Sequence, residues 1–231
     1  MTARLVVVTG GTRGIGAAIV AAFTALGDTV RAVGRAECDV TDEAAVAEFF
    51  AVAGEVDVLI NNAGVAASAP LRRTTLADWR RLIEVNATGA FLCTRAVLPG
   101  MLERDRGRIV TVASTAGLAG ARYTAAYTAS KHAAVGLTRA VAAEVAGTGV
   151  TANAVCPTFV RTDLTRESTS RIAATTGRTQ EQAEAALAAA SPLGRLLEPH
   201  EVAFAVTFLA APRAAAINGQ TLVLDGGGMA S

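Results

Sequence analysis

The fold is decided close to the N-terminus, where the chain reads Leu5-Val6-Val7-Val8-Thr9-Gly10-Gly11-Thr12-Arg13-Gly14-Ile15-Gly16. The aliphatic run is typical of a buried β-strand, and an alanine-rich helical pattern begins at about residue 14. Glycines at such a junction let the backbone turn tightly and approach a pyrophosphate, which lies at the positive N-terminus of the following helix. The stretch therefore predicts a strand–loop–helix unit that binds a dinucleotide.

The same alternation of strand and helix continues along almost the whole chain. Strand-like aliphatic runs occupy residues 5–9, 29–33, 56–60, 108–113, 150–155 and 220–224, and helical patterns occupy residues 14–26, 42–53, 75–104, 124–147 and 200–210. Continuous apolar strands separated by helices predict a parallel sheet that is covered on both faces. We expect an α/β fold in which residues 1–231 form one domain, a Rossmann-like doubly wound parallel sheet of six to seven strands.

Residues 163–192 differ from the rest because they are polar and rich in Thr, Arg, Glu and Ala. They fit two short helices inserted between a strand and a helix. Such an insertion would overhang the carboxyl ends of the strands, where open α/β sheets bind ligands. We interpret it as a lid over the substrate.

The composition excludes several classes of protein. The net charge is +1, which gives no case for a nucleic-acid or membrane partner, and the apolar runs are too short to span a bilayer. Cys38, Cys93 and Cys156 are isolated in sequence, so we expect core residues and neither a disulfide framework nor a metal site. We expect a cytoplasmic protein.

The choice of cofactor depends on the end of the second predicted strand. Proteins that bind NAD place an acidic residue there to hold the ribose 2′-hydroxyl, whereas this chain has Gly34 followed by Arg35. A second cation, Arg13, lies in the glycine loop, and two guanidinium groups can bind a 2′-phosphate. We predict NADP(H); the alternative is that both arginines are simply surface residues of loops.

Lys131 is the only lysine of the chain, and it follows Tyr127 by four residues. On a helix this spacing directs both side chains from one face, within reach of a shared ligand. An ammonium is a compact charge that can lie beside a phenol and a sugar hydroxyl together. The alternative, an exposed helical pair, is less compatible with keeping the single lysine here.

These motifs together resemble the short-chain dehydrogenase/reductase family over essentially the entire chain. The glycine loop, Asn61-Asn62-Ala63-Gly64, Asn86, Ser114, the Tyr127–Lys131 pair and Leu224-Asp225-Gly226-Gly227 occur in the family's order. The resemblance implies a catalytic set of Asn86, Ser114, Tyr127 and Lys131. It implies substrate contacts by Ser114, Tyr123 and Tyr127. It implies cofactor contacts by Gly10, Thr12, Arg13, Gly14, Ile15, Gly16, Arg35, Asp39, Val40, Asn62, Ala63, Gly64, Tyr127, Lys131, Val160 and Thr162.

Within the family the chain looks most like reductases of 3-ketoacyl thioesters and polyketide ketones, which implies an NADPH-dependent reductase. Tyr127 would be the general acid, Ser114 would orient the carbonyl, and Asn86 would hold a water molecule that links Lys131 to solvent. We expect Lys131 to lower the pKa of Tyr127 and, by resemblance, to bind the nicotinamide ribose.

Other readings of the activity and assembly stay open at this point. One is a dehydrogenase that oxidises a secondary alcohol, and another is a sensor that binds NADP without turnover. The substrate could be linked to CoA or to a carrier protein. Arg122, Arg166, Arg171 and Arg178 could meet the phosphates of such an arm, or they could simply be solvated. Resemblance also implies a homotetramer formed through helices 86–104 and 124–147.

The sequence departs from the family pattern at two places. Only Ala36-Glu37-Cys38 separate Arg35 from Asp39, and a parallel crossover needs about a dozen residues. We predict that the usual helix is absent there and that the usual third strand is missing, displaced or vestigial. Thr158 follows Pro157 where the family has glycine, and a β-branched residue disfavours a positive φ.

Overall fold

The computed structural model describes residues 3–229, which contain a sheet of six parallel strands. The strands are β1 (Leu5–Thr9), β2 (Thr29–Val33), β3 (Val58–Asn61), β4 (Gly107–Val112), β5 (Val150–Pro157) and β6 (Thr221–Leu224). Their order in the sheet is β2-β1-β3-β4-β5-β6, and every neighbouring pair is parallel. The predicted doubly wound parallel sheet is confirmed.

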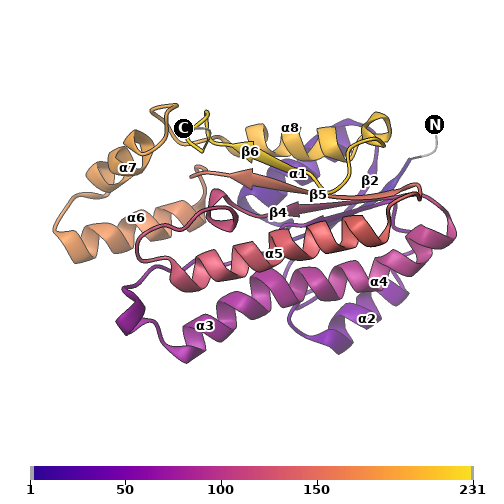
Figure 1. The fold of residues 1–231 in the computed structure, drawn as a ribbon, viewed down its shortest axis with the longest axis horizontal. Coiled ribbons are helices and arrows are strands. Elements are labelled where there is room, and N and C mark those ends of the chain that lie inside the picture. The colour runs from indigo at the N-terminus through magenta and orange to yellow at the C-terminus, as the bar shows by residue number, and fades with distance from the viewer. Residues whose placement is uncertain (1–2, 230–231) are drawn as a thin grey trace.

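Helices cover both faces of this sheet (Figure 1). They are α1 (Gly14–Ala25), α2 (Glu43–Ala51), α3 (Leu76–Ile83), α4 (Gly89–Glu103), α5 (Ala125–Glu144), α6 (Asp163–Thr176), α7 (Gln180–Ala189) and α8 (Pro199–Leu209). In the view of Figure 1, α8 lies above the sheet and α2, α4 and α5 lie below it, while α1 packs beside α8. Short 3₁₀ turns occupy Leu71–Arg73, Thr115–Gly117 and Pro212–Ala214.

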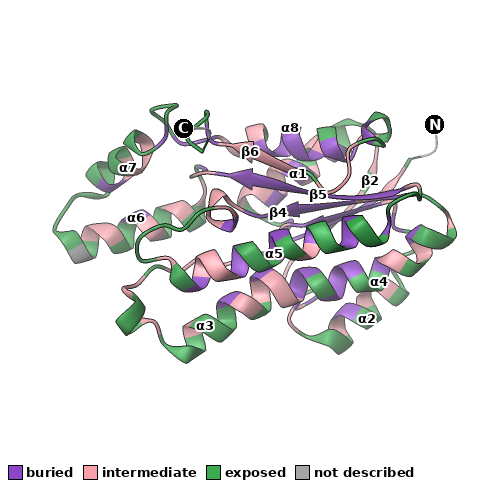
Figure 2. Ribbon diagram, viewed as in Figure 1, coloured by how far each residue is buried: buried purple, intermediate pink, exposed green. Residues whose placement is uncertain are grey.

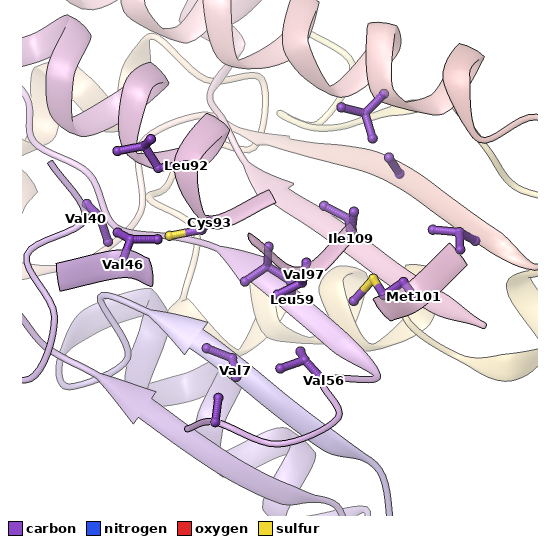
Figure 3. Packing of buried hydrophobic residues seen from close by; sticks show 14 of the residues in the cluster. Val7, Val40, Val46, Val56, Leu59, Leu92, Cys93, Val97, Met101 and Ile109 are labelled. Carbon is purple, nitrogen blue, oxygen red and sulfur yellow. The ribbon is translucent and has the colours of Figure 1, made fainter. Parts of the chain in front are cut away.

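The two-residue period of the strands divides the core between these layers. Val6 and Val8 of β1 belong to the cluster that packs against α1 and α8 and includes Phe23. Val7 points to the opposite face and joins the cluster that contains Leu59 of the neighbouring strand. Figure 3 shows this second cluster, in which Leu59 and Ile109 meet Val97 and Met101 of α4. The outer sides of the helices are exposed (Figure 2).

The connection after β2 is short, as predicted. A turn leads from Val33 to α2 at Glu43 without an intervening crossover helix, and α2 then leads to β3 in the middle of the sheet. Among the described residues no strand pairs with the outer side of β2, so β2 is an edge strand of the sheet, as β6 is at the other side. The missing strand leaves the 34–42 turn as the wall beside β2.

The helix predicted over residues 75–104 is not continuous. It consists of α3, a π-helical turn at Glu84–Thr88 and α4. A π-turn adds a residue to one turn of the helix and is frequent at functional sites. Here it contains Asn86, whose buried side chain bonds outside the helix. Apolar periodicity could not show this, because both helical forms bury the same general face.

Two helices, α6 and α7, lie where the insertion was predicted, beyond the carboxyl end of β5 (Figure 1). Within residues 3–229, no helix combines the length and apolar composition that crossing a membrane requires.

Candidate active site

A cavity of about 1180 Å³ opens at the carboxyl edge of the sheet. Its walls come from the glycine loop, the turn after β2, the ends of β3, β4 and β5, the start of α5, and α6. Every residue that the sequence proposed for substrate or cofactor lines this cavity, as do Ser114, Tyr127 and Lys131. Asn86 lies behind the wall, buried at 3% exposure.

The glycine loop is held against the end of β3 by hydrogen bonds. The Asn62 amide donates to the carbonyl oxygens of Thr9 and Gly10 at 2.9 and 3.0 Å. The Thr9 hydroxyl accepts from the backbone N–H groups of Asn62 and Ala63 at 3.1 Å. A Cβ atom on Gly16 would lie 2.1 Å from the Gly10 oxygen, so only glycine fits at that position.

The N-terminus of α1 has the features of an anion site. No side chain caps it, and its first turn contains no acidic residue. Its unpaired N–H groups and positive end therefore face the cavity lined by Gly14, Ile15 and Gly16. The loop, the close backbone approach and the uncapped helix fit the pyrophosphate of a dinucleotide.

The turn after β2 carries both signs of charge. Arg35 Nε donates to Asp39 Oδ2 at 2.9 Å in an exposed ion pair. Asp39 Oδ1 also accepts from the N–H and hydroxyl of Thr41, and these hydrogen bonds are the main reason that its pKa is lowered. The Glu37 carboxylate accepts from the N–H of Gly34 at 2.8 Å.

Tyr127 and Lys131 lie on the first turns of α5 and face the same cavity. Lys131 Nζ is 6.0 Å from the centre of the Tyr127 ring and donates to the Val112 carbonyl at 3.1 Å. Burial lowers the pKa of Lys131 to about 8, partly opposed by Cys156. The helix spacing thus delivers the predicted juxtaposition of phenol and ammonium.

The predicted direction of the Tyr127 pKa is wrong for this structure. Burial raises the pKa of the phenol, a hydrogen bond with Ser114 lowers it, and Cys156 raises it further. Removing the phenolate from water outweighs what stabilises it here. Tyr127 therefore holds its proton at neutral pH.

Asn86 fixes a loop as well as facing the lysine. Its amide exchanges two hydrogen bonds with the backbone of Val65, both at 2.9 Å, and donates to Ser130 Oγ at 2.9 Å. Asn86 Oδ1 and Lys131 Nζ both flank Gly64, where a Cβ atom would lie 3.3 and 3.5 Å from them. Ser130 was missed by the sequence analysis, although it directly precedes Lys131.

Ser114 ends the β4 region and begins a 3₁₀ turn, with its Oγ accepting from the N–H of Ala116 at 3.1 Å. Cys156, buried at 0% exposure, acts electrostatically on both Tyr127 and Lys131. The sequence assigned it only to the core, as it did Cys38 and Cys93, and all three cysteines are buried and free.

The remaining predicted positions surround the mouth of the cavity. Tyr123 is 54% exposed, has φ +66°, and stacks under the Arg122 guanidinium at 5.3 Å. Thr162 caps α6 and its methyl group would meet a Cβ at Gly14. Thr158 does not have a positive φ, so the β-branched side chain causes no backbone strain there. Its N–H donates to the Leu224 carbonyl at 2.9 Å.

The chain is similar to known proteins over nearly its whole length. A family model described as Enoyl-(Acyl carrier protein) reductase matches residues 3–228. A 3-oxoacyl-[acyl-carrier-protein] reductase of Synechocystis sp. is 38% identical, with 98% of this chain and 97% of the relative covered. An inactive 2-(S)-hydroxypropyl-CoM dehydrogenase 2 of Xanthobacter autotrophicus is 43% identical over 82% of each chain.

Among solved structures, a variant of the actinorhodin polyketide ketoreductase with NADPH superposes with a TM-score of 0.90. It is 34% identical and the match covers 97% of both chains. The order of the motifs, the six-stranded sheet and the near-complete match to the family model agree, and the chain belongs to the short-chain dehydrogenase/reductase family of oxidoreductases.

Proposed function

We propose that the protein is an NADPH-dependent reductase of a ketone or a 3-ketoacyl thioester. The observation that carries the proposal is the convergence of Ser114, Tyr127 and Lys131 on the cavity that the glycine loop also lines. Membership of the family does not by itself give catalysis, since one relative is named as inactive. The presence of the full set, with Asn86 behind it, favours turnover over a sensor role.

The cofactor would be held along the glycine-loop side of the cavity. The uncapped N-terminus of α1 suits the pyrophosphate, Asp39 and Val40 suit the adenine, and Arg13 and Arg35 suit a 2′-phosphate. Asn62, Ala63 and Gly64 also line the cavity, as do Val160 and Thr162. The bound cofactor supplies a hydride to the carbonyl carbon of the substrate.

The residues of the chain supply the proton and orient the substrate. The Ser114 and Tyr127 hydroxyls donate to the carbonyl oxygen, and Tyr127 gives its proton as the oxygen becomes an alkoxide. The raised pKa of Tyr127 keeps that proton available at neutral pH. Lys131, with a pKa of about 8, stabilises the phenolate that forms, and the Asn86 amide oxygen, beside Gly64, holds the water that returns the proton.

The relatives and the mouth of the cavity both support the proposed substrate class. The Synechocystis relative is named for a 3-oxoacyl substrate on acyl carrier protein, and one structural neighbour is a polyketide ketoreductase. In this chain Arg122 and Tyr123 lie at the mouth, where a cationic aromatic pair suits a thioester arm that carries phosphate.

The test compares the two tyrosines. Tyr127→Phe removes the proton donor, so NADPH oxidation with acetoacetyl-CoA at 340 nm should fall by about 10²-fold or more. NADPH binding, measured by fluorescence, should stay close to that of the wild type. Tyr123→Phe, which keeps the ring at the mouth, should reduce turnover far less. Turnover of more than a few per cent in Tyr127→Phe would refute the proposed role.

A further inference from the structure

We infer that Glu37 sets the selectivity between the two nicotinamide cofactors, by supplying the acidic group that position 34 lacks. The inference rests on the proposed function, because it concerns the same cofactor site. In the sequence, Gly34 stands where an NAD-binding protein has its acidic side chain. In the structure, a carboxylate reaches that place from three residues further along.

The position of the carboxylate is given by two contacts. Glu37 Oε2 accepts from the Gly34 N–H at 2.8 Å. A Cβ atom built on Gly34 would lie 2.8 Å from the same oxygen and 3.1 Å from the Thr12 methyl carbon. The Glu37 carboxylate therefore occupies the space in which a side chain of residue 34 would begin, against the glycine loop.

The shortened connection makes this possible. With only three residues between Arg35 and Asp39, the chain folds back on itself, and the N–H groups of Glu37 and Cys38 both bond to the Gly34 carbonyl at 3.2 and 3.1 Å. A chain that continued into a crossover helix would carry residue 37 away from this edge. The turn thus brings the Glu37 carboxylate beside Gly34, and no sequence motif indicates this position.

The charge of the site is consequently balanced and not basic. Arg35 is already paired with Asp39, and Glu37 adds a second carboxylate beside Thr12 and Gly34. Arg13 and Arg35 favour a 2′-phosphate, whereas Glu37 repels it and can accept a hydrogen bond from a 2′-hydroxyl. Glu37 is exposed, so it can leave Gly34 when a phosphate enters, at the cost of that hydrogen bond.

This arrangement predicts that the protein prefers NADPH over NADH less strongly than Arg13 and Arg35 alone would make it do. Neutralising Glu37 should raise the affinity for NADPH and lower the affinity for NADH. The ratio of the two dissociation constants should change by about fivefold, the size of one exposed charge interaction. The change should shrink at high salt, because exposed charges are screened.

The experiment measures the dissociation constants of NADPH and NADH by fluorescence titration for wild type, Glu37→Gln and Glu48→Gln. Glutamine keeps an acceptor for the Gly34 N–H, and Glu48→Gln makes the same charge change on the exposed side of α2. We expect the NADH-to-NADPH ratio to rise in Glu37→Gln alone. An unchanged ratio, or an equal rise in Glu48→Gln, would overturn the inference. Failure of the wild type to bind either nucleotide would instead refute the proposed function.

Discussion

Lys131 belongs to the proposed catalytic set, and its burial lowers the stability of the folded protein. The residue is 6% exposed, and its ammonium donates a hydrogen bond to the Val112 carbonyl at 3.1 Å. Burial lowers its pKa to about 8 from an ordinary 10.5. The unfolded chain therefore binds this proton more tightly than the folded one does, and below about pH 8 the folded state must carry a buried charge.

We expect Lys131→Met to be inactive but more stable than the wild type. The pKa difference corresponds to roughly 3 kcal/mol at pH 7, and loss of the Val112 hydrogen bond offsets about 1 kcal/mol. The variant should therefore gain about 2 kcal/mol in the free energy of unfolding. Between pH 8 and 10.5 the folded wild type releases the proton that the unfolded chain still holds, so its stability rises and the gap closes. Urea unfolding at pH 7 and pH 10 measures the gap; an equal gap at both would contradict the explanation.

At the scale of elements, α6 and α7 stand out because most of their surface is exposed (Figure 2). Their attachment includes Arg161, which bonds Glu198 at the start of α8 at 2.9 Å and also pairs with Glu184 of α7. Leu164, Ile172 and Leu187 turn from these helices toward the cavity. Exposed ion pairs contribute little free energy, so we predict that these two helices move as a lid.

Arg161→Met should loosen this lid without unfolding the protein. Amide hydrogen exchange should accelerate in residues 180–189, while the melting temperature should change by less than about 3 °C. The KM for substrate should rise more than kcat falls, because the lid closes over the substrate. Arg106→Met, which breaks the pair between an exposed arginine and the partly buried Asp57 away from these helices, is the control. Equal exchange in α7 of wild type and Arg161→Met would contradict a lid held by Arg161.

At the scale of the whole molecule, α4 and α5 present an unusual outer surface. Phe91 of α4 is 42% exposed, and Ala133, Gly136 and Ala140 of α5 are exposed. A Cβ atom on Gly136 would meet nothing within 4 Å in this chain, so a single chain has no steric need for glycine there. Small residues let two helices approach closely, which agrees with the predicted homotetramer through these helices.

Gly136→Trp should separate the chains of this assembly. The side chain has free space in one chain but would obstruct a close helix contact, so light scattering at micromolar concentration should show a lower mass than the wild type. Thr24→Trp places the same ring on the exposed side of α1, on the other face of the sheet, and should leave the mass unchanged. A wild type that is already a monomer would contradict the predicted assembly.

Much of this protein could be predicted from its sequence because the signals are local. The strand runs, the glycine loop after β1 and the four-residue spacing of Tyr127 and Lys131 each depend on neighbouring residues only. The short connection after Arg35 likewise excludes a crossover helix at that point, since three residues are too few to connect two parallel strands. These signals gave the parallel sheet and its missing strand, and the resemblance to the family added most of the residues that line the cavity.

Other features depend on residues that are far apart in the sequence, and only the tertiary structure decided them. The π-turn at Asn86 exists beside Val65 and Ser130, which come from two other segments. The pKa of Tyr127 is raised mainly by burial, with Ser114 lowering it and Cys156 raising it, and these groups come from separate segments. Glu37 reaches the space beside Gly34 only because the turn folds back. The sequence by itself determined the strands, the glycine loop and the Tyr127–Lys131 pair. The protonation of these groups and partners such as Ser130, Cys156 and Glu37 were decided by the packing, because desolvation and hydrogen bonding depend on what surrounds each group in space.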